Sequence, residues 1–324
     1  MSPLSKALRV AAALLVSGHA VGLSAQSYPE RPVRLVVPLS AGGSADIVGR
    51  LLAQKLSERL GQQFVIDNRP GAGSLIGTEI AARAPKDGYT LLLAGSSFTS
   101  TPSLHRKLPY DPVKDFAPIT LASMAPGLLV VHPSVPVRTV RELIDLARAK
   151  PGTINYATPG NGTSPHFAGA LFNLMAKVDM VHVPFKGAGP AVAGVVGGQV
   201  QVSFASMLSA ITQARQGRLR AIAVTGVKRS PAVPDLPTVA ESGVPGFESG
   251  SWQGFFAPSG TPAAIRSRLH REIAAIVHLP DIAAQLAKDG SEPIGSTSAE
   301  FSKFVTAELA KYARVAKAAG MQVN

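Results

Sequence analysis

The chain has 324 residues, of which 46% are hydrophobic and 16% charged, and its formal net charge is +12. This composition can bury a substantial core and excludes an intrinsically disordered chain. The absence of cysteine excludes disulfides, thiolate catalysis and cysteine-ligated metals. Lys and Arg form no cluster interleaved with aromatic residues, so the charge predicts a diffuse field that favours anionic partners, and no nucleic-acid site.

The first 25 residues are typical of a cleavable signal peptide. Lys6 and Arg9 give a positive start, residues 10–18 (VAAALLVSG) form a short apolar run, and small residues precede a cleavage site after Ala25. The alternative is a membrane anchor, but the apolar run is short for a bilayer span. We therefore expect export to the periplasm, without a lipid anchor because no cysteine is available.

The rest of the chain alternates strands and helices. In chain order we expect strand 33–38, a helix ending near 61, strand 63–68, helix 74–84, strand 89–97, a looser region at 106–127, strand 128–133, helix 139–150, strand 154–160, helix 164–177, strand 180–185, helix 189–198, strand 199–207, a helix around 211–215, strand 219–226, strand 252–258, and helices 262–278, 280–289 and 298–319. The first three strands are continuous apolar runs, as in parallel sheets covered on both faces. Thr139 and Glu142 form a capping box at one helix start.

This order predicts an α/β fold with two domains. The final helices, which follow the last strand, are expected to pack back on the first sheet. Domain 1 would comprise residues 27–124 plus 252–324, and domain 2 residues 125–251. The chain would cross between the domains near 122–126 and near 250–254.

Four turns at strand ends are rich in small residues and hydrogen-bond donors: PLSAGGSAD (38–46), RPGAGS (69–74), AGSSFTST (94–101) and ATPGNGTSPH (157–166). Ligands of open parallel sheets bind at the carboxyl ends of the strands, and helix N-termini there attract anions. Gly42 and Gly43 let the backbone approach a ligand closely. One such turn alone indicates only a tight bend, but four on alternating strands predict an anion site.

Signatures of catalysis are missing from the mature chain. It has no G-x-S-x-G elbow and no P-loop, and GAGSLIG (71–77) has the wrong spacing for a dinucleotide fingerprint. The histidines show no metal-ligand spacing. We therefore expect neither an enzyme nor a metal or other cofactor.

Several single residues leave two interpretations open. His166 at a helix start either donates to a ligand or caps its own loop, and Lys186 either attracts a carboxylate or is an ordinary surface lysine. Asp46, in the first turn of its helix, favours a structural role that complements the helix dipole. Trp252, the only tryptophan, favours packing at the domain crossing.

Residues 28–79 (YPERPVRLVVPLSAGGSADIVGRLLAQKLSERLGQQFVIDNRPGAGSLIGTE) closely resemble the N-terminal block of the Bug family, the solute-binding proteins of tripartite tricarboxylate transporters. The segments LPYDPVKDFAPITL, YATPGNGTSPHFAG, VHVPFKGAGPAV and WQGFFAPSGTP extend the resemblance over nearly the whole mature chain. It implies a two-domain periplasmic binding protein of the second type, which closes over a small carboxylate and needs no cofactor.

The resemblance also implies a set of binding residues. Carried onto this chain, they are Ser40, Ala41, Gly42, Gly43, Ser96, Ser97, Thr158, Gly162, Thr163 and His166. Ala205 and Ser206 complete the predicted ligand site, and Asp46, Gly73 and Lys186 are further candidates. The chain departs from the family at Ala205 and Gly194, where Asp is frequent, and at Phe185, where Tyr is usual. Loss of an acidic group at Ala205 argues against an amino-acid ligand.

Three functions follow from these features. The first is a monomeric periplasmic protein that delivers a di-, tri- or aromatic carboxylate to transporter membrane subunits. The second is a solute sensor that uses the same pocket and reports to a membrane kinase, which co-purification would distinguish. The third is an exported α/β hydrolase, which requires a nucleophile and base that the sequence does not supply.

Overall fold

The computed structural model describes residues 28–288 and 290–321, so the predicted signal peptide lies outside the described residues. The strands are β1 (Val33–Val37), β2 (Phe64–Asn68), β3 (Thr90–Gly95), β4 (Phe116–Val131), β5 (Asn155–Thr158), β6 (Val181–Pro184), β7 (Val202–Ser206), β8 (Arg220–Val224), β9 (Gly250–Pro258) and β10 (Glu292–Pro293). The predicted α/β class is confirmed.

Helices cover these strands. They are α2 (Ser44–Leu60), α3 (Leu75–Ala82), α4 (Ser96–Ser100), α5 (Val140–Ala149), α6 (Ser164–Ala176), α7 (Ala188–Val196), α8 (Met207–Arg215), α9 (Ala263–Val277), α10 (Pro280–Lys288) and α11 (Ser298–Ala318), with 3₁₀ turns η1 (Ala72–Ser74) and η2 (Thr101–Ser103). None of the helices in the described ranges is long and apolar enough to cross a membrane.

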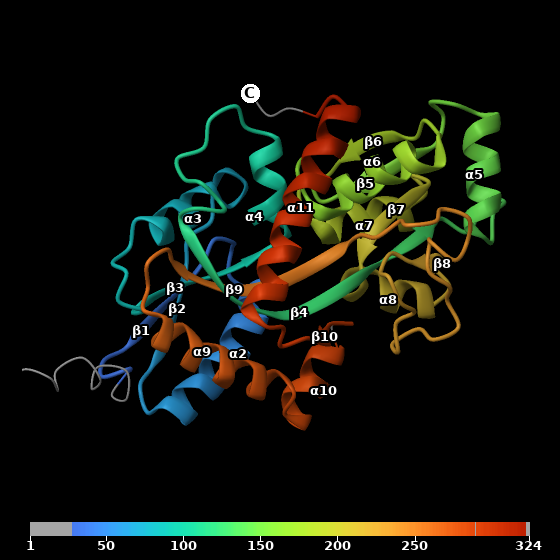
Figure 1. Cartoon of the computed structure of the whole chain (residues 1–324). Coiled ribbons are helices and arrows are strands. Elements are labelled where there is room, and N and C mark those ends of the chain that lie inside the picture. The colour runs from blue at the N-terminus through green and yellow to red at the C-terminus, as the bar shows by residue number, and fades with distance from the viewer. Residues whose placement is uncertain (1–27, 289, 322–324) are drawn as a thin grey trace, which may run out of the picture.

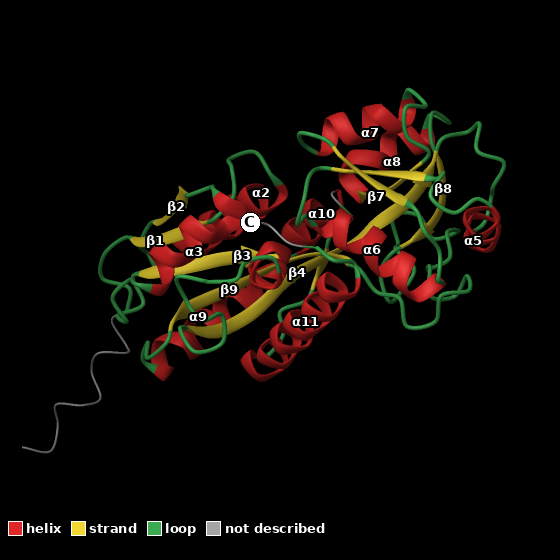
Figure 2. Cartoon of the chain, turned by 90° about the horizontal axis from the view of Figure 1, so that it is seen from above, coloured by secondary structure: helices red, strands yellow, loops and turns green. Residues whose placement is uncertain are grey.

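The strands follow the order β2-β1-β3-β9-β4-β7-β5-β6, and β8 and β10 also pair with β4. The predicted parallel pairing holds for β1 with β2 and β3, and for β5 with β6 and β7. The long strands β9 and β4 run antiparallel to their neighbours. Figure 2 shows two lobes, with β4 running from one into the other.

Strand β4 changes partners at the boundary between the lobes. Up to Pro126 it pairs with β9, and from Gly127 onward it pairs with β7 and β8. Residues 116–127 belong to this strand, although the sequence predicts a looser region there. Pro118 and Pro126 are residues that a sequence pattern assigns to loops, so the strand is not recognised there. Its register with β9 shifts twice, between Pro118 and Thr120 and between Leu121 and Ser123.

Helix α11 contacts both lobes and stands across β4 in Figure 1. Its first half buries Phe301 and Val305 with Trp252 and Phe256 of β9. Its second half buries Tyr312 and Val315 with residues of the second lobe. The final helix is therefore a third connection between the lobes. We propose the domain boundaries at 124/125 and 251/252 that the sequence predicts.

Candidate functional site

Helix N-termini gather where the lobes meet. Strands β1 and β3 are parallel neighbours, so the starts of α2 and α4 lie at one edge of the first sheet. The starts of α6, α7 and α8 follow β5, β6 and β7, which are also parallel. The two groups meet at the Gly250 carbonyl oxygen, which accepts hydrogen bonds from the hydroxyls of Ser96 (3.2 Å) and Ser164 (2.9 Å).

These five helices lack side-chain N-caps. None of α2, α4, α6, α7 and α8 has a side-chain hydrogen bond at its N-cap, and Asp46 is the only acidic residue in any of their first turns. The first N–H groups of a helix have no partner inside the helix and carry a partial positive charge. The cleft edge therefore presents donors that an anion can occupy.

The exposed turn of Ser40, Ala41, Gly42 and Gly43 is braced from behind. Asp46 is 3% exposed, and its Oδ2 accepts from the Gly42 N–H (2.9 Å) and from Arg50 Nε (3.1 Å). Burial opposes the charge of Asp46, but hydrogen bonds from Arg50 and Gly42 outweigh it and hold its pKa below the ordinary value. Asp46 thus shapes the turn, the structural role that its sequence position favours.

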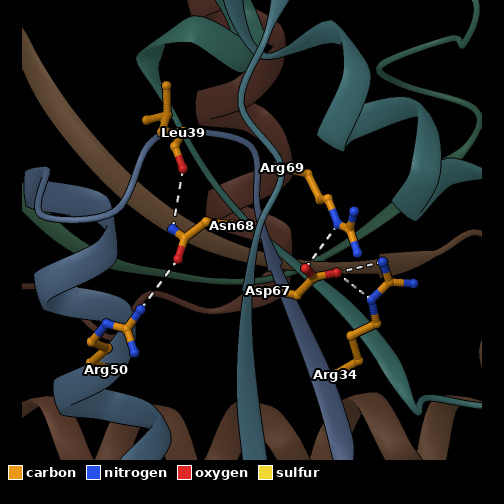
Figure 3. Close-up of polar contacts among 6 residues, drawn as sticks. All are labelled: Arg34, Leu39, Arg50, Asp67, Asn68 and Arg69. Carbon is orange, nitrogen blue, oxygen red and sulfur yellow. Dashed lines mark hydrogen bonds and ion pairs between the residues drawn. The ribbon is translucent and has the colours of Figure 1, made fainter.

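Figure 3 shows how β2 extends this brace. The Asn68 amide donates to the Leu39 carbonyl (3.2 Å) and accepts from Arg50 (3.2 Å). Next to it, Asp67 pairs with Arg34 and with Arg69 (2.8 Å). Burial again opposes ionisation, but both guanidinium groups lower the pKa of Asp67. The β2 end is therefore a charged scaffold behind the first lobe's turn.

Helices α4, α6 and α11 contact one another where the two lobes meet. Ser96 is 7% exposed, and the Ser97 hydroxyl is buried with no partner among the described residues. Tyr312 of α11 lies close to Ser96 and Ser164, and burial raises the pKa of its phenol far above the ordinary value. Sequence reasoning missed Ser164, although it lies within a quoted turn, and missed Tyr312, which no local pattern distinguishes.

The second lobe contributes the loop Thr158–Thr163, which is tied largely to itself. The Thr163 hydroxyl donates to Gly160 O (2.8 Å), and Thr158 is fully buried with its hydroxyl 2.6 Å from His182 Nε2. The Gly162 N–H donates to His166 Nδ1 (3.1 Å). Across the lobes, the Ser100 hydroxyl donates to Gly162 O (3.2 Å).

The remaining predicted residues occupy different surroundings. Ala205 is buried, Ser206 is exposed, and both line a cavity of about 40 Å³ between the lobes with Ser164, Pro165 and Gly250. Gly73 is exposed, and its carbonyl accepts from the Thr101 hydroxyl (2.6 Å). Lys186 is exposed.

Phe185 and Gly194 are packed together in the second lobe. A Cβ at Gly194 would lie 2.5 Å from Phe185 Cζ, so the ring occupies the space that a side chain on α7 would need. Phe185 also packs on the core beside Ala205 and Val192. Phe185 and Gly194 therefore fit against each other, and this wall is apolar.

The described residues contain no group of three or more His, Asp or Glu that could hold a metal ion. What the site offers is a set of hydroxyls and free backbone N–H groups. Such groups can bind an anion.

The tripartite tricarboxylate transporter family receptor model matches residues 48–321. The chain belongs to this receptor family. Among its relatives, BugT of Bordetella pertussis is 34% identical over 96% of each chain. A UPF0065 protein from the tcbD–tcbE intergenic region of Pseudomonas sp. strain P51 is 39% identical over 83% of this chain and 80% of its own.

Solved structures of the family share the fold. R. palustris Rpa4515, solved with adipate, is 38% identical with a TM-score of 0.79, covering 91% of this chain and 99% of its own. Periplasmic binding protein BugD is 34% identical (TM-score 0.76, 91% and 99%). MatC of Rhodopseudomonas palustris, solved with malate, is 32% identical (TM-score 0.75, 89% and 99%). The chain is a periplasmic solute-binding receptor of the two-domain, second-type fold.

Proposed function

We propose that this receptor captures a small dicarboxylate between its lobes and delivers it to the membrane subunits of a transporter, after export through the signal peptide at residues 1–25. The observation that carries the proposal is the group of five uncapped helix N-termini, two from one lobe and three from the other. A dicarboxylate can place one anionic group against each lobe, and Ser40–Gly43, Ser96, Ser97 and Thr158–Thr163 would donate to it.

The charge of the site favours an acid without an ammonium group. No acidic side chain lines the small cavity beside Ala205 and Ser206, and Asp46 is already engaged by Gly42 and Arg50. A ligand ammonium would therefore be buried without a counter-charge, which is costly. Relatives crystallised with adipate and malate support an acid of this size.

Malate and aspartate form a matched pair for testing this proposal, because they differ only in hydroxyl versus ammonium. Calorimetry and thermal unfolding of the mature chain with adipate, malate and aspartate are expected to show binding of a dicarboxylate and at least about tenfold weaker binding of aspartate, which corresponds to about 1.4 kcal/mol. At 100 times its dissociation constant a ligand stabilises by about 2.7 kcal/mol. Absence of stabilisation by every carboxylate would refute the proposal.

A further inference from the structure

Two histidines of the second lobe form a stacked pair behind the Thr158–Thr163 loop. The ring centroids of His166 and His182 lie 3.8 Å apart with planes inclined by 14°. His166 is on α6 and His182 on β6, where it is paired in register with Tyr156 of β5. The pair therefore links α6 to β6, while the loop itself runs from β5 to α6.

Each ring also holds one end of the loop. The His166 Nδ1 accepts the Gly162 N–H (3.1 Å), and the His182 Nε2 lies 2.6 Å from the Thr158 hydroxyl. The backbone N–H groups of Asn161, between these anchors, and of Thr163, directly after the second, have no partner among the described residues. The direction of those free N–H groups depends on where the two anchors are fixed.

His166 lies on a different face of α6 from the residues at the cleft. Ser164, Pro165 and Ala168 line the cavity between the lobes. His166 and His182 instead line a cavity of about 390 Å³ with Tyr156, Asp179, Met180 and the end of α11. This arrangement favours loop capping over direct ligand contact, the alternative that the sequence left open for His166.

We propose that His166 and His182 are positioning residues, whose stacked rings hold the Thr158–Thr163 loop in the shape that presents its free N–H groups to the carboxylate. This inference rests on the proposed function. The contact to Gly162 requires an unprotonated Nδ1 on His166, and two stacked imidazolium rings would repel each other.

Protonation should therefore disrupt the unit. Burial, together with the neighbouring His182, lowers the pKa of His166 to about 4, and burial lowers the pKa of His182 to about 4. The titratable groups that line the same cavity are Tyr156 of β5 and Asp179, and the α11 residues there, Ala318, Ala319 and Met321, are uncharged. Both rings are thus neutral at pH 7 and become charged as the pH falls toward 4.

The test compares two substitutions at one position. His166→Asn keeps an acceptor near Nδ1, whereas His166→Leu removes it and keeps the bulk. With adipate as the probe, His166→Leu is expected to weaken binding roughly tenfold, the scale of one lost hydrogen bond, and His166→Asn less than about threefold. His132→Ala, at the end of β4 away from the cleft, serves as the control.

A second readout keeps the positioning role separate from the ligand. In the ligand-free protein, hydrogen exchange of the Gly162 amide is expected to be faster in His166→Leu than in His166→Asn. In the wild type, the protection factor of this amide, which corrects for intrinsic exchange at each pH, is expected to be lower at pH 4.5 than at pH 7. Equal protection in both variants would overturn the positioning role. If exchange responds as expected but no adipate or malate binds, the proposed function fails and the loop anchor stands. Equal adipate affinity in both variants would overturn the role in binding.

Discussion

Two groups of helix starts differ in capping, and α3 and α9, which belong to neither group, also begin without a side-chain cap. At α5 and α11, Thr139 with Glu142 and Thr297 with Glu300 form complete capping boxes. At the cleft, α2, α4, α6, α7 and α8 start without any side-chain cap. A side-chain cap satisfies the same N–H groups that a ligand would use. The helices at the cleft therefore lack the stabilisation that a side-chain N-cap gives, and their first backbone N–H groups stay free to bind a ligand.

Installing a cap at the cleft gives the largest expected effect. Gly43, the N-cap of α2, has an extended backbone, and a Cβ there would meet only Ser40 O at 3.5 Å. Gly43→Asp should stabilise the fold by only a few tenths of a kcal/mol, since Gly is itself a tolerated N-cap, but weaken dicarboxylate binding at least about 100-fold, because like charges about 4 Å apart repel by about 4 kcal/mol near the surface. Calorimetry and urea unfolding measure both. Gly43→Asn, which caps without charge, should lose less; equal loss would show that charge is not the cause.

Removing the brace behind the same turn should have the next largest effect. Asp46→Ala leaves the Gly42 N–H and Arg50 without their shared acceptor. A hydrogen bond to a charged group contributes about 1.5–3 kcal/mol, so we expect a loss of that order in unfolding free energy and weaker adipate binding. Asp46→Asn, which retains an oxygen for Gly42, should recover part of the affinity. An unchanged affinity in Asp46→Ala would remove the turn from the binding site.

The histidine pair predicts an acid-sensitive second lobe. The folded-state pKa of each ring is about 4, against an ordinary value of 6.5. The unfolded chain therefore takes up protons first, and stability is lost as the pH falls from about 6.5 toward 4. Discounted for partial exposure, the loss is about 2 kcal/mol for the pair. Chemical unfolding of wild type and of His166→Asn/His182→Gln across this range measures it. Parallel pH profiles would contradict the assignment.

Removing a distant cap should have the smallest effect and leave binding intact. Thr139→Ala deletes the acceptor for the Glu142 N–H at the start of α5. Loss of an N-cap costs about 1 kcal/mol, which urea unfolding resolves, while adipate affinity should stay within error. A change in affinity would mean that the two kinds of helix start are not functionally separate.

Sequence reasoning reached most of the fold because its signals are local. Continuous apolar runs indicate β1 and β3, and the Thr139–Glu142 box marks the start of α5. The first half of β4 was missed, because Pro118 and Pro126 resemble loop residues while β9 supplies the pairing. The Thr297–Glu300 box of α11 has the same local signal and was overlooked.

The candidate site divides in the same way. The sequence by itself determined the turns at 38–46 and 157–166, since small residues at strand ends leave the backbone accessible. At 94–101 the prediction was wrong, because the strand ends at Gly95 and Ser96–Ser100 form the short helix α4. Only the tertiary structure decided which groups stand behind them: Arg50 and Asn68 behind one turn, and His182 behind another. It also packed Tyr312 of α11 against Phe167 of α6, more than a hundred residues away. Local geometry follows from neighbouring residues, whereas these contacts exist only after the two sheets and α11 have packed.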